Sequence, residues 1–250
     1  MRRLTKLASI LGAAALMATT TVYAAADMVN GKKIFIEGKG SVPACTSCHG
    51  EKGMGNDMLG TPRLAGQVVQ FLVKQLEDFA TDKRMDTTMF VMNANAKGLS
   101  AQDRIDVSYY MSKQMTTFAE SASEPSNLAE LKENGVEVGS PYLGKIMVKY
   151  GLTDRDIPAC KSCHGFNGRG AEPVYPKINE QKYSYLVSQL KKWRDGSRNN
   201  DPMSQMQVVA RQLTDEDINN AAAYLTSAPQ TTDGNSRAAA MHEPKSYSSH

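Results

Sequence analysis

Cysteine and histidine are scarce in this 250-residue sequence, which contains only four of each. All four cysteines fall within two copies of one motif, C-x-x-C-H, which runs from Cys45 to His49 and from Cys160 to His164. No cysteine therefore remains for a structural disulfide elsewhere in the chain. Within each motif, oxidation of the cysteine pair to a disulfide stays open as an alternative, as in thiol redox proteins.

Long apolar runs are also missing, and the only candidate lies at the N-terminus. The first 26 residues combine a basic start, a short apolar run and small residues at the end: Arg2, Arg3 and Lys6, then 7–17, then Ala24, Ala25 and Ala26. This pattern predicts a secretory signal peptide over 1–26 that is cleaved, because the run is well short of the roughly 20 residues that span a bilayer. We expect a periplasmic protein with no transmembrane anchor after cleavage.

An excess of charge of either sign is missing once the signal peptide is removed. The predicted signal peptide carries three of the 29 basic residues and none of the 26 acidic ones, which leaves 26 of each. A balanced chain gives no support for nucleic-acid binding or for a basic membrane-binding patch.

The sequence contains an internal repeat of about 115 residues. The two motifs match at an offset of 115, and a series of later residues matches at 114. The later matches are Pro62, Phe71-Leu72-Val73, Gln75-Leu76, Arg84, Met92, Leu99, Asp103 and Tyr110 with Pro176, Tyr185-Leu186-Val187, Gln189-Leu190, Arg198, Met206, Leu213, Asp217 and Tyr224. A unit of this length indicates a duplicated domain rather than a solenoid repeat.

Each half is predicted to be helical. Apolar residues at helical spacing indicate a helix near 67–80 and its counterpart around Tyr185 to Trp193. Ser100 with Asp103, and Thr214 with Asp217, resemble capping boxes that open the last helix of each half. Asp201 and Pro202 are expected to begin a short helix that carries Met203 and Met206. No alternating strand pattern occurs, so the fold class is expected to be all-α.

These observations divide the chain into segments. We expect a first domain over 27–115, a linker and lead-in over 116–138, a second domain over 139–229 and a disordered polar tail over 230–250. The Ser-, Thr- and Glu-rich stretch at 116–127 is expected to be exposed.

The duplicated C-x-x-C-H motif predicts two covalently attached haem c groups. Its two thiols are spaced to bond the vinyl groups of one haem, and the adjacent histidine can ligate the iron. The four attachment residues are Cys45, Cys48, Cys160 and Cys163. A thioredoxin-like site would need a βαβ setting, and a zinc site would need four ligands brought together from both halves. The export signal and the duplication therefore favour haem.

The second axial ligand of each iron is expected to be a methionine, since His242 and His250 are the only other histidines and lie in the polar tail. A thioether opposite histidine raises the reduction potential, which suits an electron carrier. Each half offers a pair in equivalent places, Met89 with Met92 and Met203 with Met206. Core packing is the alternative role for any one methionine, and spacing alone does not choose within a pair.

These residues resemble the cytochrome c4 family, whose members are dihaem carriers with two class I cytochrome c domains. The resemblance covers roughly 30–115 and 140–228 and rests on CTSCHG and CKSCHG, RLAGQVVQFLVKQLEDF with YLVSQLKKW, and the LSAQD and LTDED helix starts. It implies an all-α fold of two tandem domains, each wrapped around one haem. It also implies His49 with Met92 and His164 with Met206 as iron ligands.

The resemblance further implies that the carbonyls of Pro62 and Pro176 accept a hydrogen bond from the haem histidines and orient them. A loop proline that only directs the backbone is the alternative. Arg84 and Arg198 occupy matched positions where a guanidinium could pair with a haem propionate, or could be a solvated surface group. One departure from the repeat is INEQ at 178–181 where the first half has LAGQ at 64–67.

The sequence thus predicts a periplasmic electron shuttle rather than an enzyme. Its expected partners are redox proteins, with a membrane oxidoreductase as donor and a terminal oxidase or reductase as acceptor. The alternative is an electron-accepting subunit of a dehydrogenase complex, such as a sulfur-oxidising one. A dihaem peroxidase is disfavoured because both halves offer a methionine in the same place, whereas a peroxidase needs an open iron position.

Overall fold

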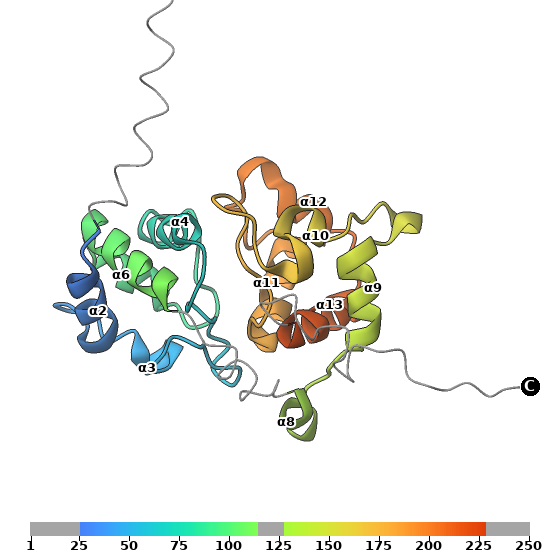
Figure 1. Cartoon of the computed structure of the whole chain (residues 1–250), viewed down its shortest axis with the longest axis horizontal. Helices are drawn as coiled ribbons and strands as arrows, with labels where there is room; N and C mark the ends of the chain where they lie inside the picture. The colour runs from blue at the N-terminus through green and yellow to red at the C-terminus, as the bar shows by residue number, and fades with distance from the viewer. Residues whose placement is uncertain (1–25, 115–127, 229–250) are drawn as a thin grey trace, which may run out of the picture.

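The computed structural model describes residues 26–114 and 128–228, which form two helical domains side by side (Figure 1). Within these residues β-structure is limited to isolated bridges, such as that between Lys39 and Val42. No helix in the described part of the chain is long and apolar enough to cross a membrane. The predicted signal peptide up to residue 25, the stretch 116–127 and the tail 230–250 lie outside the described residues.

The first domain contains five helices. They are α2 (Met28–Glu37), α3 (Thr46–His49), α4 (Val69–Ala80), α5 (Met92–Lys97) and α6 (Ala101–Lys113). Its core is formed by apolar side chains from α2, α4 and α6, namely Ile34, Phe35, Leu72, Val107 and Met111. The buried face of α4 includes Leu72 and Phe79, as the predicted apolar face of 67–80 requires.

The second domain repeats this order. Its helices are α8 (Leu128–Glu133), α9 (Pro141–Tyr150), η1 (Thr153–Arg155), α10 (Lys161–His164), η2 (Phe166–Gly168), α11 (Tyr183–Asp195), η3 (Pro202–Ser204), α12 (Gln205–Ala210) and α13 (Asp215–Ser227). Helix α8 lies in the segment assigned to the linker and lead-in, and its Leu128 and Leu131 are buried in the core of this domain.

Helices α2 and α6 of the first domain, and α9 and α13 of the second, cross at a glycine. A Cβ on Gly31 of α2 would overlap the carbonyl group of Asp106 in α6, and a Cβ on Gly144 of α9 would overlap that of Asn220 in α13. The absent side chain thus lets the two backbones meet at each crossing.

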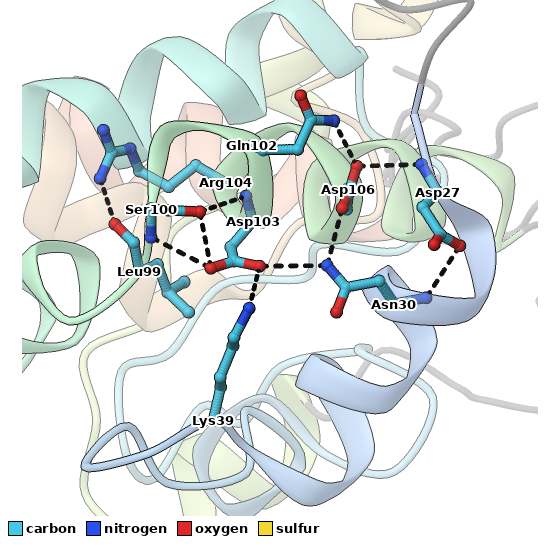
Figure 2. A network of polar contacts seen from close by, with 9 residues as sticks. All are labelled: Asp27, Asn30, Lys39, Leu99, Ser100, Gln102, Asp103, Arg104 and Asp106. Atoms are coloured by element: carbon cyan, nitrogen blue, oxygen red, sulfur yellow. Dashed lines mark hydrogen bonds and ion pairs between the residues drawn. The ribbon is translucent and has the colours of Figure 1, made fainter.

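Both predicted capping boxes are present. Ser100 and Thr214 each accept a hydrogen bond from the backbone N–H three residues later, and the carboxylates of Asp103 and Asp217 accept from the cap backbone in return. In the first domain Asp103 also joins a network that ties α6 to α2 (Figure 2). It accepts from Lys39 Nζ at 2.6 Å and from Asn30 Nδ2 at 3.0 Å.

The short helix expected to carry Met203 and Met206 is interrupted. The structure divides it into η3 and α12, because Met203 and Ser204 adopt left-handed backbone angles, with φ of 56° and 55°. The two methionines therefore do not share one continuous helix. In the first domain Met89 likewise lies before α5, and Phe90 next to it has a φ of 57°.

The domains meet through α4, α11 and the loops on both sides of these helices (Figure 1). Arg63 forms an ion pair with Glu180 at 2.5 Å, and Asp57 Oδ1 accepts from the Ser184 N–H at 2.8 Å. Arg63 is 5% exposed, so the interface excludes water at this point. The two domains are therefore held in one arrangement by polar contacts between them.

Candidate haem sites

Each C-x-x-C-H motif forms one helical turn. Helix α3 follows Cys45 directly, and the His49 N–H donates to the Cys45 carbonyl at 2.9 Å. Helix α10 repeats this with a 2.9 Å bond from His164 to Cys160. Residues three and four apart lie on the same face of a helix, so both cysteines and the histidine of each motif face the same side.

The tautomer of each histidine follows from its hydrogen bond. His49 Nδ1 lies 3.0 Å from the Pro62 carbonyl oxygen, and His164 Nδ1 lies 2.9 Å from that of Pro176. A carbonyl oxygen only accepts, so Nδ1 carries the proton in both rings. Burial lowers the pKa of both histidines and favours the neutral ring. In a neutral ring protonated at Nδ1, Nε2 has a free lone pair, which is what an iron ligand requires.

The first cysteine of each motif is not an activated thiol. Burial raises the pKa of Cys45 to about 11 and that of Cys160 to about 11, so both thiols stay protonated near neutral pH. Reactive cysteines and zinc ligands are thiolates with lowered pKa values. Across residues 26–114 and 128–228, no group of three or more His, Cys, Asp and Glu side chains could hold a metal ion. The raised pKa values give no support to a reactive thiolate at Cys45 or Cys160.

The methionine pairs differ in exposure. Met92, at the start of α5, and Met206, in α12, are half-buried. Met89 is 42% exposed and Met203 is 83% exposed. A half-buried thioether is the better candidate for an iron ligand, because the ligand must face the interior of the domain. Ligation by Met92 and Met206 stays a prediction that this difference favours.

An aspartate organises the segment that carries each methionine. Asp86 accepts from the Met92 N–H at 3.3 Å, and Asp201 accepts from the Met206 N–H at 2.7 Å. Burial alone would raise the pKa of Asp86, but four backbone N–H donors outweigh it and lower that pKa. The ionised carboxylate thus fixes the loop. Sequence reasoning assigned no such role to Asp86, although Asp201, which binds the Met206 N–H in the second domain, was expected to begin a helix.

Arg84 and Arg198 are not solvated surface groups, so that alternative is wrong. They are 7% and 6% exposed and stack on aromatic rings, Arg84 on Phe79 at 4.6 Å and Arg198 on Trp193 at 4.2 Å. Their guanidinium groups meet at the domain interface.

Two glutamines join these arginines across the interface. Gln75 Oε1 accepts from Arg84 Nη1 at 2.8 Å and from Arg198 Nη2 at 3.1 Å, and Gln189 Oε1 accepts from Arg198 Nη1 at 2.7 Å and from Arg84 Nη2 at 2.8 Å. Sequence matching found both glutamines as repeat positions. It could not show that they contact the opposite domain, because a repeat does not define how its copies are placed.

The charge of this cluster fits the predicted cofactor. In the described part of the chain, no carboxylate lies within ion-pair distance of either guanidinium. Burial and the neighbouring Arg84 lower the pKa of Arg198, which reflects two like charges in a site of low polarity. Buried cations need anions, and haem propionates are anions of the right kind. Arg84 and Arg198 would hold these propionates at the interface.

Comparisons with known proteins agree with this geometry. The sequence pattern of the family described as Cytochrome c matches residues 28–114 and 155–229. The chain is 34% identical over 186 residues to a "Thiosulfate dehydrogenase electron acceptor" of Thiomonas intermedia, covering 74% of this chain and 79% of that protein. It is 32% identical over 228 residues to a protein of the same name from Stutzerimonas stutzeri, covering 90% and 96%. Cytochrome c4 of Stutzerimonas stutzeri is 30% identical over 199 residues, covering 75% and 86%.

Two solved structures are similar throughout both domains. Thiosulfate dehydrogenase from Marichromatium purpuratum has a TM-score of 0.70 and 30% identity over 82% of this chain, which spans 41% of that protein. Reduced cytochrome c4 from Pseudomonas stutzeri has a TM-score of 0.63 and 26% identity, covering 82% of this chain and 100% of that one. The predicted all-α fold with two cytochrome c domains is confirmed.

The relatives named for electron acceptance and the cytochromes c4 are electron carriers rather than enzymes. The family pattern covers both domains, and each domain contains one C-x-x-C-H motif with a neutral, buried histidine. The chain therefore belongs to the cytochrome c family, as a dihaem c-type electron carrier with one haem c in each domain.

Proposed function

We propose that this cytochrome accepts electrons from a periplasmic dehydrogenase, one on each haem, and passes them singly toward a terminal oxidase or reductase of a respiratory chain. The observation that carries the proposal is the pair of matched sites joined by a buried polar interface. Dehydrogenases commonly release electrons in pairs, and two linked haems can accept such a pair. Thiosulfate dehydrogenase is the candidate donor, since two relatives are named as its electron acceptor.

The proposed coordination uses residues of this chain in matched roles. Cys45 and Cys48 would bond one haem and Cys160 with Cys163 the other. The iron ligands would be His49 with Met92 and His164 with Met206. Bound haem supplies the exchange of a single electron between ferrous and ferric iron.

The surrounding residues would set the stability of each oxidation state. Pro62 and Pro176 hold the imidazole rings at a fixed angle through their carbonyl groups. Methionine opposite histidine favours the ferrous state, and Arg84 with Arg198 would neutralise the propionates.

A periplasmic location and a cleaved signal peptide over 1–26 belong to the same proposal. The c-type relatives and the N-terminal pattern of the sequence support it. Sequencing the N-terminus of the protein recovered from the periplasmic fraction tests it. A mature chain that begins near residue 27 is the expected result, and an intact Met1 would contradict it.

The functional test mixes the oxidised holoprotein with thiosulfate dehydrogenase and thiosulfate and follows haem reduction in a stopped-flow spectrometer. We expect reduction of both haems, and no reduction when thiosulfate is omitted. A redox titration of the same sample should give two haems at positive potential, as methionine ligation requires. Two such haems that the dehydrogenase does not reduce would contradict the assigned donor.

A shuttle from a membrane oxidoreductase to an oxidase is the second candidate. It is favoured by the similarity to cytochromes c4 over 86% of the length of the Stutzerimonas stutzeri protein. Rapid reduction by quinol oxidoreductase in membranes, without copurification of a dehydrogenase, would establish this function instead.

A further inference from the structure

Two glutamines reach across the domain interface to equivalent backbone positions. Gln181 Oε1 accepts from the Arg63 N–H at 2.7 Å, and Gln181 Nε2 donates to the Arg63 carbonyl at 3.0 Å. Gln67 Oε1 accepts from the Lys177 N–H at 2.7 Å, and Gln67 Nε2 donates to the Lys177 carbonyl at 2.8 Å. Both side chains are buried, at 6% exposure for Gln67 and 5% for Gln181.

The peptide groups that these glutamines bind are the ones that orient the haem histidines. The Arg63 N–H belongs to the same peptide group as the Pro62 carbonyl, which accepts from His49 Nδ1 at 3.0 Å. The Lys177 N–H belongs to the same peptide group as the Pro176 carbonyl, which accepts from His164 Nδ1 at 2.9 Å. Each histidine is thus linked, through one peptide group, to a glutamine of the opposite domain.

The orientation of each glutamine amide is fixed by its neighbours. Gln67 Oε1 also accepts from the Val68 N–H at 2.9 Å, and Gln181 Oε1 accepts from the Lys182 N–H at 2.9 Å. Both backbone groups around each oxygen are donors, so a rotated amide would place its NH₂ group against two N–H groups. The oxygen therefore faces the peptide N–H in both domains.

Two hydrogen bonds made by the same peptide group strengthen one another. An acceptor at a peptide N–H draws the proton toward itself and increases the negative charge on the carbonyl oxygen of the same group. A more negative carbonyl accepts more strongly from the histidine Nδ1–H, which makes the imidazole a more basic ligand. A more basic ligand stabilises the oxidised iron and lowers the reduction potential.

We propose that Gln67 and Gln181 are positioning residues that act across the interface. Gln181 sets the orientation and basicity of His49, and Gln67 sets those of His164. The inference rests on the proposed haem ligation by these histidines. It adds that the reduction potential of each haem depends on contact with the other domain.

The test replaces each glutamine with methionine, which keeps the length of the side chain and removes both hydrogen bonds. In Gln181→Met the reduction potential of the first-domain haem should rise by up to about 59 mV. For one electron this is a tenfold change in the oxidised-to-reduced ratio. The second-domain haem should keep its potential. Gln67→Met should give the reverse result. Redox titration followed by NMR of the haem methyl signals measures each haem separately.

A second variant guards against loss of docking, because methionine leaves the Arg63 N–H and carbonyl without their partners. Gln181→Glu keeps an oxygen for the N–H and adds negative charge, so the first-domain potential should fall. Undocking would not produce opposite shifts from two substitutions at one position. Thr88→Val is the matched control, since it removes a cross-domain bond from Lys192 Nζ at 2.6 Å that has no link to a histidine. It should leave both potentials unchanged.

Three results would overturn the inference: no shift in Gln181→Met, a shift of the haem in the same domain as the substitution, or equal shifts of both haems. Small-angle scattering of the same samples reports whether the domains stay docked. Failure of the proposed function is seen separately, in the wild-type protein, as the absence of two His/Met haems. If wild type has both haems and the crosswise shifts do not occur, only this inference fails.

Discussion

The two domains share their haem sites in detail but differ in the residues around them. The residue before the histidine-orienting proline is Thr61 in the first domain and Tyr175 in the second. Thr61 Oγ1 donates to the Cys48 carbonyl at 2.6 Å, whereas the Tyr175 ring lies edge-on to His164 with centroids 6.0 Å apart. Hydrogen bonding and polarity near the ligand tune haem potential. The comparison teaches that both domains keep a histidine bound to a proline carbonyl, whereas the residues around it differ, and we expect this difference to give the two haems different reduction potentials.

The surfaces next to the attachment helices differ as well. In the second domain Lys149 Nζ lies over the Phe166 ring at 5.1 Å, and Lys161 Nζ lies over the Tyr150 ring at 5.2 Å. The matched positions in the first domain are Ile36, Glu51, Thr46 and Glu37. These four positions thus carry two lysines in the second domain and two glutamates in the first. Since charge steers the choice of partner, we expect the two domains to favour different redox proteins.

Exchange of Met92 and Met206, the proposed iron ligands, should have the largest effect on this comparison. Met92→His and Met206→His should each lower the potential of one haem, on the order of a few hundred millivolts within the about 0.8 V range set by axial ligands. The cause is the more basic nitrogen ligand, which stabilises ferric iron. Redox titration with optical detection measures the shift, and the haem that responds identifies the domain.

The neighbouring methionines supply matched controls for that experiment. Met89→His and Met203→His change exposed side chains and should leave both potentials near their wild-type values. A large shift in either control, with none in Met92→His or Met206→His, would show that the ligands are assigned to the wrong member of each pair.

Substitution of the glycines at the helix crossings should have the next largest effect. Gly31→Ala and Gly144→Ala should each destabilise one domain by about 1–3 kcal/mol, the usual cost of overpacking a tight contact. The new methyl would press on the backbone of α6 or of α13. Urea unfolding followed at the haem absorbance measures the loss. Lys32→Ala changes an exposed residue of the same helix as Gly31 and should leave stability almost unchanged.

Sequence reasoning succeeded where structure depends on nearby residues. The capping boxes at Ser100 and Thr214 were predictable because each needs only a hydroxyl and a carboxylate three residues apart. The break at Met203 was not predictable, since a left-handed backbone at a residue other than glycine is imposed by tertiary contacts.

Contacts between the domains also could not be predicted from the sequence. LAGQ at 64–67 and INEQ at 178–181 differ in three of four letters and share only the final glutamine. Gln67 and Gln181 become informative only when the domain arrangement places each beside the opposite haem loop. The glutamine shared by these two otherwise different segments was the sequence feature that could have indicated its role.

Substitution of the capping aspartates should produce the smallest difference in stability between the two domains. This difference should depend on pH. Burial raises the pKa of Asp103, but hydrogen bonds from Lys39, Asn30 and Ser100 outweigh it and hold that pKa well below its usual value. The balance at Asp217 is similar, with burial outweighed by Arg155 and Thr214. Asp103 is 4% exposed, whereas Asp217 is half-buried. Loss of the Asp103 carboxylate should therefore cost more stability than loss of the Asp217 carboxylate.

Asp103→Asn should destabilise the protein by about 1–2 kcal/mol near neutral pH, the usual value of a helix cap, and Asp217→Asn by less. A lowered pKa means that the ionised group stabilises the fold above its unfolded pKa of about 3.9, and that this stability is lost as pH falls toward the folded value. Urea unfolding at several pH values should thus show the gap between wild type and Asp103→Asn closing below about pH 4. If the difference in unfolding free energy stays constant down to about pH 2, the amide destabilises the fold through its geometry rather than through the loss of charge.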